Sequence, residues 1–216
     1  MNLVLLFKDD FVAEDVVRFA GRRLEHIRTV HRVAPGDELA VGLLDGRMGK
    51  GHLTRLEEGS LEMTVELTEA PPPKRPLTLL LALPRPKVLN RVLASATSLG
   101  VERIFLINAW KVEKSYWKSP RLSEDNLLLQ RILGLEQAKD TRLPELHLRR
   151  LLRPFAETEL PGLAAGTLAL VAHPGVPDPC PRAVDQPVTL AIGPEGGFLP
   201  AEIDLLERAG FKAVDL

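Results

Sequence analysis

The stretch Val188–Pro200 reads VTLAIGPEGGFLP, and its pattern indicates the fold. Residues 188–192 form an apolar run typical of a buried strand, which leads into a glycine-rich turn. Pro200 then stands at the first position of a predicted helix, with Glu202 in its first turn. Glycines in such a turn permit a positive φ and let a ligand touch bare backbone groups. The spacing matches neither GxGxxG nor a P-loop, so the turn is either a tight connection without a ligand or one wall of a binding site.

The residues before this stretch alternate between strand and helix patterns. Apolar runs predict the strands, and helical periodicity with capping residues predicts the helices. Strands are predicted over 77–83, 103–107, 168–172 and 188–192, and helices over 87–99 and 123–139. This alternation is typical of an α/β domain with a largely parallel sheet. Because the carboxyl ends of parallel strands share one edge, the turn AHPG at 172–175 and the glycine-rich turn can form one crevice.

The first 70 residues have a different rhythm, in which turn signals recur about every ten residues. Strands are predicted over 2–7, 38–44, 48–56 and 61–67, and a helix over 16–30. The proline-rich residues 71–76 cannot continue a helix or a central strand, because proline fixes φ and donates no hydrogen bond. The sequence therefore predicts a small β-barrel over residues 1–70, a linker over 71–76 and an α/β domain over 77–216.

The composition is that of an ordinary soluble globular protein, with 45% hydrophobic and 26% charged residues. No apolar run approaches the roughly 20 residues of a spanning helix, and the first ten residues are too acidic for a signal peptide. We therefore expect a cytoplasmic protein without membrane contact. The single cysteine, Cys180, excludes an internal disulfide and a CxxC pair. His26 and His31 lack the spacing of zinc ligands, so no metal is expected.

The net charge of −1 hides a segregation along the chain. Residues 71–153 hold 16 Lys and Arg against 7 Asp and Glu, whereas residues 1–70 hold 9 against 13 and residues 154–216 hold 3 against 9. The middle third can therefore hold a polyanion, or it can be a set of solvated helix faces. Within it, WKVEKSYWK at 110–118 interleaves cations with aromatic rings. This pattern suits phosphates and unpaired bases, and it also suits a solvated loop with a small aromatic cluster.

Several motifs carry a resemblance to a known family. They are IGPEGGF at 192–198 with Glu202 downstream, AHPG at 172–175, and GLEQA at 134–138 followed by LPE at 143–145. An H-x-x-x-V-x-R pattern at His26, Val30 and Arg32 is one position out of its usual spacing. Together these motifs resemble the RsmE family of 16S ribosomal RNA uridine-N3 methyltransferases. The resemblance implies a SPOUT-class α/β domain threaded as a trefoil knot, an N-terminal PUA-like barrel, S-adenosylmethionine (SAM) as cofactor, a homodimer, and RNA of the small ribosomal subunit as substrate.

The resemblance also implies roles for particular residues. SAM would be held by Ala172, His173, Pro174, Ile192, Gly193, Pro194, Glu195, Gly196, Gly197 and Leu216. Glu195 would either fix its loop or contact the substrate or cofactor directly. Uridine N3 is a weakly acidic imide, so methyl transfer requires its proton to leave. Glu136 and His173 are the candidate bases, and each is also a plausible structural hydrogen-bonding residue.

RNA would be held by Arg22, Arg28, Arg32, Arg85, Lys87, Lys111, Lys114 and Lys118. The chain departs from the family at Ser95, Ser98, Asp140 and Leu199. Family members also continue beyond Leu216, so we expect the closing knot segment to be incomplete and SAM binding by this chain to be weak. The alternative function is a catalytically silent RNA-binding or ribosome-assembly protein of the same fold. A nucleotide-binding α/β enzyme is disfavoured, because the phosphate-loop signature is missing.

Overall fold

The computed structural model describes residues 2–31 and 33–215, without the side chains of Val30 and His31. The chain forms two compact units. The first comprises Met1–Pro73, Thr97–Leu99 and Leu129–Leu143, and the second comprises Lys74–Ala96, Gly100–Leu128 and Pro144–Leu216. The sequence pattern places a boundary close to Pro73, but it gives no sign that residues 129–143 pack with the amino-terminal unit.

The first unit is built on a curled five-stranded sheet. Its strands are β1 (Val4–Leu6), β2 (Val16–Phe19), β3 (Glu38–Leu43), β4 (Met48–Leu56) and β5 (Leu61–Glu69), in the order β1-β3-β4-β5-β2. The β1–β3 pair is parallel and the other pairs are antiparallel. Alternate residues of these strands point inward, so that Val17, Val41 and Met63 are fully buried in one core.

The predicted helix over residues 16–30 is partly wrong. Residues Val16–Phe19 form β2, which pairs with β5, and the helix α1 spans only Arg22–His26. A π-helical turn, Ile27–His31, follows it. Gly21, with a φ of 67°, separates strand from helix. Val16 and Val17 are β-branched residues whose apolar spacing fits either period, and the long-range pairing with β5 decides in favour of the strand.

The second unit is built on a six-stranded sheet in which every pair is parallel. Its order is β11-β9-β10-β6-β7-β8. The strands are β6 (Arg75–Ala82), β7 (Val101–Ile107), β8 (Glu145–Arg149), β9 (Leu168–Ala172), β10 (Val188–Ile192) and β11 (Lys212–Val214). The predicted strands over 168–172 and 188–192 agree with β9 and β10 at both ends. Since β10 lies between β9 and β6, its residue Ile192 pairs with Ala172 on one side and Leu81 on the other.

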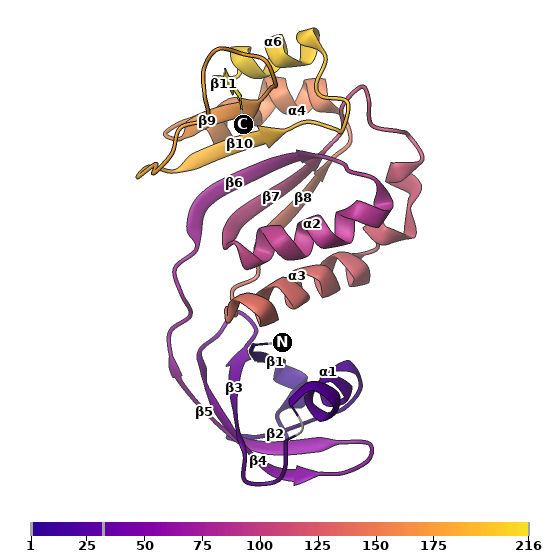
Figure 1. The fold of residues 1–216 in the computed structure, drawn as a ribbon, viewed down its shortest axis with the longest axis vertical. Coiled ribbons are helices and arrows are strands. Elements are labelled where there is room, and N and C mark those ends of the chain that lie inside the picture. Colours follow the sequence, from indigo (N-terminus) through magenta and orange to yellow (C-terminus); the bar gives the residue numbers. More distant parts are fainter. Residues whose placement is uncertain (1, 32, 216) are drawn as a thin grey trace. The chain divides into compact units, whose positions relative to one another are not determined.

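Helices cover both faces of this sheet, as Figure 1 shows, with α2 on one side and α4 and α6 on the other. The helices are α2 (Pro86–Ser98), α3 (Glu124–Ala138), α4 (Leu152–Thr158), α5 (Leu160–Ala164) and α6 (Pro200–Arg208). Two-sided cover explains why β6 and β7 are nearly continuous apolar runs, with Leu80 and Leu106 fully buried. Among the described residues, no helix combines the length and the apolar composition that crossing a membrane requires.

Candidate cofactor and RNA site

A cavity of about 290 Å³ opens at the carboxyl ends of β9 and β10. The last residues of the two strands, Ala172 and Ile192, are register partners and form its floor with the loops that follow them. The lining residues are Ala172, His173, Pro174, Ile192, Gly193, Pro194, Glu195, Gly197 and Asp215. A ligand site at the carboxyl edge of a parallel sheet is the arrangement expected for this architecture. Of the predicted cofactor residues, Gly196 does not line the cavity and Leu216 lies outside the described residues.

The glycine-rich loop has its shape because two of its positions exclude a side chain. A Cβ on Gly193 would lie 3.0 Å from the buried ring of Phe198 and 3.1 Å from the Phe198 amide nitrogen. Gly197 has a φ of 71°, and its N–H donates to the Pro194 carbonyl at 2.7 Å. A residue with a Cβ would therefore be crowded against Phe198 at the first position and would strain the backbone at the second. The loop keeps its backbone close to the cavity as a result.

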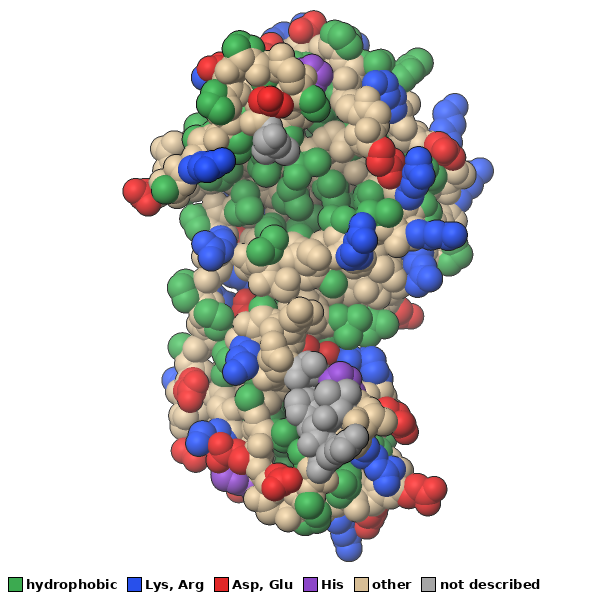
Figure 2. All heavy atoms as spheres, viewed as in Figure 1, with side chains coloured by type: hydrophobic (Ala, Val, Ile, Leu, Met, Phe, Trp, Pro, Cys, Tyr) green, Lys and Arg blue, Asp and Glu red, His purple; other side chains and the backbone are tan. Residues whose placement is uncertain are grey.

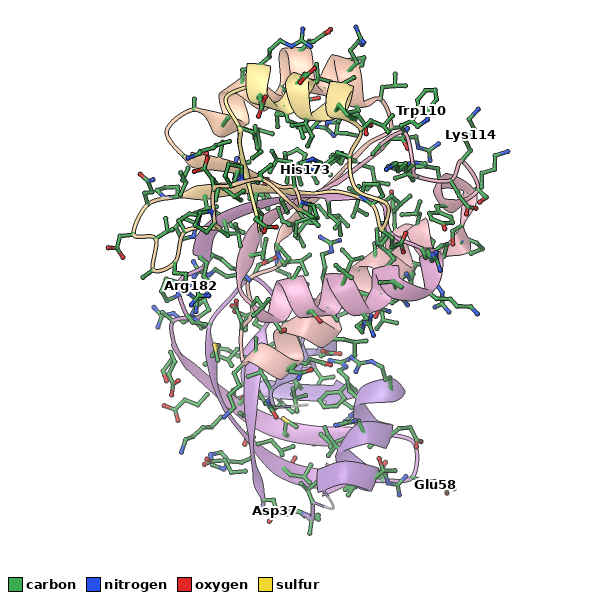
Figure 3. The ribbon with its side chains drawn as sticks, turned by 45° about the horizontal axis from the view of Figure 1, so that its top comes forward. Asp37, Glu58, Trp110, Lys114, His173 and Arg182 are labelled. Carbon is green, nitrogen blue, oxygen red and sulfur yellow. The ribbon has the colours of Figure 1, made fainter. Side chains whose placement is uncertain are left out.

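His173 lines this cavity and has an unpaired polar atom in its side chain. Its backbone N–H donates to the Val214 carbonyl at 2.9 Å, which fixes the residue at the end of β9. Its side-chain Nδ1 is buried and has no hydrogen-bond partner within the part of the chain that the structure describes. Buried polar atoms in folded proteins are nearly always paired, so the imidazole of this cavity-lining residue has hydrogen-bonding capacity left over. Figure 3 shows His173 within the unit built on β9 and β10.

Asp215 completes the cavity, and the sequence reasoning did not include it. β11 pairs with β9 in parallel, with Val214 opposite Ala172, so the next residue arrives at the same edge as His173. The Asp215 carboxylate also accepts a long hydrogen bond of 3.4 Å from the Gly175 N–H. The signal was present in the sequence, since an acidic residue directly follows an apolar strand of a parallel sheet.

The loop after β7 is tied to the glycine-rich loop by two side chains. The Lys111 ammonium donates to the Gly196 carbonyl, and a Cβ on Gly196 would lie 2.9 Å from the Lys111 Cδ. The Glu202 carboxylate accepts hydrogen bonds from the backbone N–H of Trp110 at 2.7 Å and from the backbone N–H of Leu199 at 2.9 Å. Lys111, which was predicted to bind RNA, uses one of its three ammonium donors in this link and is exposed. Its contact with Gly196 also helps to position the glycine-rich loop.

Arg85 and Glu195 form an ion pair beside the cavity. The distance between Arg85 Nε and Glu195 Oε1 is 3.4 Å, and both side chains are largely exposed. Such a pair is weak in water, so Arg85 is free to exchange its partner for a phosphate. Tyr116 lies close enough for both charges to act on it. Desolvation, with the neighbouring Glu113 carboxylate, raises the pKa of Tyr116, which therefore stays a neutral hydrogen-bond donor.

Glu136, the other candidate base, is buried and paired within the first unit. Its side chain is 2% exposed and belongs to the first unit, and it does not line the cavity. Both of its carboxylate oxygens accept hydrogen bonds of 2.9 Å from the Arg22 guanidinium. Glu136 and Arg22, which were predicted as a base and as an RNA contact, therefore pair with each other, and the Arg22 side chain stays 40% exposed. No sequence pattern relates residues that are 114 positions apart.

The remaining predicted RNA contacts divide into three groups. Lys87, Lys114 and Lys118 are exposed, and none has an ion pair or hydrogen bond to another side chain among the described residues. Arg28 donates to the Glu58 carbonyl at 2.8 Å and stays exposed. Arg32 lies outside the described residues. Figure 2 shows Lys and Arg side chains gathered on one side of the second unit, the side on which Figure 3 labels Lys114.

Within residues 2–31 and 33–215, no group of three His, Cys, Asp or Glu side chains is arranged to hold a metal ion. The polar groups at the cavity are instead one imidazole, two carboxylates and the backbone of two loops. Such a set suits an organic ligand that carries both positive charge and hydrogen-bonding groups.

The parallel sheet, its edge cavity and the separate curled sheet define the class of protein. The fold is that of the SPOUT-type α/β methyltransferases. More particularly, the chain belongs to the RNA methyltransferase domain family, which it matches over residues 71–216.

Relatives of known name agree with this family. The chain is 30% identical over 222 residues to the ribosomal RNA small subunit methyltransferase E of Treponema pallidum, covering 100% of this chain and 84% of that protein. It is 26% identical to the protein of the same name from Mycobacterium bovis, covering 88% and 75%.

Solved structures share the fold across both units. A methyltransferase of Legionella pneumophila with bound SAM has a TM-score of 0.74 at 22% identity, covering 100% of this chain and 88% of that one. The ribosomal RNA small subunit methyltransferase E of Neisseria gonorrhoeae bound to SAM has a TM-score of 0.71 at 19% identity, covering 99% and 89%.

Proposed function

We propose that this protein is a SAM-dependent methyltransferase that modifies N3 of a uridine in 16S ribosomal RNA. The observation that carries the proposal is the cavity between the β9 and β10 loops, which His173 and the glycine-rich loop line. The family to which the chain belongs supports RNA methylation as the reaction. The names of the relatives support RNA of the small ribosomal subunit as the substrate. Such a substrate is found in the cytoplasm, which is where we place the protein.

The residues of the cavity fit the cofactor. Bound SAM would supply an activated methyl group on its sulfonium. The cofactor also carries an ammonium, and Glu195 and Asp215 are carboxylates available to both positive charges. The backbone of Gly193–Gly197 would hold the rest of the molecule, and the absence of side chains at Gly193 and Gly197 keeps that backbone accessible.

The reaction places one demand on the protein besides binding. The N3 proton of uridine must leave while the nitrogen stands in line with the methyl group. Of the two candidate bases, His173 lines the cavity and has an unpaired nitrogen, whereas the carboxylate of Glu136 is held by Arg22. We therefore assign proton acceptance to His173.

The test of the function is a methylation assay with small ribosomal subunits that lack the modification. With labelled SAM, the expected result is one methyl group per 16S RNA, mapped to a uridine by mass spectrometry of nuclease fragments. N3 methylation blocks the pairing edge, so reverse transcriptase should stop one nucleotide before that uridine. Transfer to another atom would overturn the position, and RNA binding without transfer would favour the silent assembly protein.

The salt dependence of RNA binding tests the basic surface. Each phosphate contact to single-stranded RNA contributes about 0.7 to the slope of log K against log salt. The triple variant Lys87→Ala/Lys114→Ala/Lys118→Ala should therefore flatten the slope by roughly 2. Filter binding from low to moderate salt measures it.

A matched control removes the same charge elsewhere in the second unit. Arg75 stands at the start of β6, Arg208 ends α6 and Arg182 lies in the loop before β10. The triple change of these three arginines to alanine should leave the slope unchanged. If both triple variants flatten the slope equally, the RNA is not held at the predicted cations.

We further propose that the protein acts as a homodimer and that the curled sheet of the first unit is a PUA-like RNA-binding domain. Support comes from the family relationship and from the coverage of both units by the solved relatives. Analytical sedimentation at tens of micromolar should give twice the chain mass of 23.8 kDa. A single species at the chain mass would overturn the dimer.

A further inference from the structure

Trp110 is a large apolar side chain presented to solvent. Its exposed fraction is 80%, the highest among the exposed large hydrophobic residues that the structure describes. Trp110 lies in a turn between two buried residues, Ala109 and Val112. The backbone N–H of Val112 donates to the Ala109 carbonyl at 3.0 Å and closes this turn. The backbone N–H of Trp110 donates a hydrogen bond of 2.7 Å to the Glu202 carboxylate. The backbone is thus fixed while the indole is left without a packing role.

The indole of Trp110 borders a surface hollow. A hollow of about 300 Å³ lies beside Trp110. Leu152, Leu205 and Leu199 supply apolar walls, and Asn108 and Glu202 supply hydrogen-bonding groups. A planar ring laid on the indole would therefore find room, an apolar surface and polar groups at its edge.

The charges around this hollow are those that attract phosphates. Arg153 lines it, and Arg150 lies one residue beyond β8 with its guanidinium 5.5 Å from the Trp117 ring. Arg153 and Lys114 are exposed and form no ion pair among the described residues. In Figure 3, Trp110 and Lys114 lie on the same outer side of the unit. A docking site for an apolar protein segment would not need this surplus of unpaired cations.

The hollow lies on the same edge of the sheet as the cofactor cavity. All six strands are parallel, and Ile192, Leu81, Ile107 and Arg149 are close in register at their carboxyl ends. β7, which precedes the loop that holds Trp110, is two strands from β10 in the order β10-β6-β7. With neighbouring strands about 4.8 Å apart, the two sites are separated by roughly 10 Å along the edge. Arg85 follows β6, the strand between them.

From these observations we infer that Trp110 is a stacking platform for an unpaired base of the RNA, close to the nucleotide that enters the cofactor cavity. Arg150, Arg153 and Lys114 hold the phosphates of that single-stranded segment. The inference rests on the proposed function in taking RNA as the ligand. It adds that the RNA is recognised as a single strand, since a paired base within a duplex does not offer its face to a side chain.

The experiment measures binding of short RNA to the full chain, separately from methyl transfer. Trp110→Ala should weaken binding of a single-stranded oligonucleotide by about 5- to 100-fold, the usual range for loss of one base–aromatic stack. Trp110→Phe keeps a ring and should recover most of the affinity. The same RNA annealed to its complement should bind equally to all three proteins. Thermal unfolding should not change, because Trp110 buries almost nothing.

Fluorescence gives a second readout that reports contact directly. The chain has two tryptophans, so Trp117→Phe leaves Trp110 as the sole indole. Single-stranded RNA should quench this emission, and duplex RNA should not. Leu99→Ala is the matched control, since Leu99 is 66% exposed and precedes β7 at the opposite end of that strand. It should bind RNA as the unchanged protein does.

Equal binding by Trp110→Ala and the unchanged protein, with no quenching, would overturn the inference and would favour a protein partner at this surface. Equal loss of single-stranded and duplex RNA would also overturn it, because it would show a contact without base stacking. If the stacking results hold but no methyl group is transferred, the proposed function fails and this inference stands.

Discussion

His173→Ala should lower the rate of methyl transfer by about 10²- to 10⁴-fold, the usual contribution of a positioned general base. The residue is placed by its backbone bond to Val214 and lines the cavity, and its Nδ1 has no partner among the residues that the structure describes. Removing the imidazole leaves the N3 proton without an acceptor there. Single-turnover kinetics with saturating SAM measure this rate without contributions from product release.

Separate measurements of rate and affinity distinguish proton acceptance from cofactor binding. If His173 accepts the proton, the variant should bind SAM as the unchanged protein does and transfer the methyl group slowly even at saturating SAM. If His173 only holds the cofactor, the dissociation constant of SAM should rise while the rate at saturation is kept. The second result would remove His173 from the chemistry.

Two control variants sharpen this test. His52→Ala removes an exposed histidine of the first unit and should leave transfer unchanged. Glu136→Gln removes the other candidate base, whose two oxygens are bound by Arg22, and should affect stability rather than the rate. A loss of transfer in Glu136→Gln, with the fold intact by circular dichroism, would return Glu136 to the list of candidate bases.

Gly197→Val should reduce SAM affinity by more than a hundredfold. Gly197 lines the cavity and has a φ of 71°, a backbone conformation that strains a β-branched residue. No atom lies within 4 Å of an added Cβ, so the valine side chain would fit without a clash and the strain would fall on the backbone. The Pro194–Gly197 turn would relax, so that backbone groups worth about 1 kcal/mol each would no longer meet the ligand. Isothermal titration calorimetry with SAM measures the loss.

Gly166 offers a closely matched control for that substitution. Its φ is 72°, it also has no atom within 4 Å of an added Cβ, and it lies outside the cavity, between α5 and β9. Gly166→Val and Gly197→Val should therefore lose similar stability, about 1–2 kcal/mol, in chemical denaturation. Only Gly197→Val should lose SAM binding. Equal affinity in the two variants would show that the glycine-rich loop does not hold the cofactor.

Short-range physics explains why much of the second unit could be predicted. The apolar runs 168–172 and 188–192 must be buried on both faces, and Ser123 and Pro200 begin helices for local reasons of capping and fixed φ. Once the sheet is parallel, the loops after β9 and β10 necessarily reach one edge. The cavity and most of its lining residues follow from that rule.

Where the sequence pattern was compatible with two structures, contacts with residues far away in the chain determined which one formed. Residues 16–19 have an apolar pattern that fits a helix or a strand, and pairing with β5 makes them a strand. A glutamate of α3 and an arginine of α1 were each predicted as functional residues, and the structure shows them bound to each other. Such outcomes depend on chain segments more than forty residues apart, which periodicity and local propensity do not relate.

The sequence by itself determined the α/β class, the parallel strands, the glycine-rich loop and the excess of positive charge, because each depends on residues that are close along the chain. Only the tertiary structure decided that Lys111 holds Gly196, that Asp215 joins the cavity wall, and that Trp110 stands exposed beside Arg153. These relations arise from the strand order β11-β9-β10-β6-β7-β8, which brings together loops that lie far apart in sequence. The order is set by how whole strands and helices bury one another, a long-range effect that no single stretch of residues encodes.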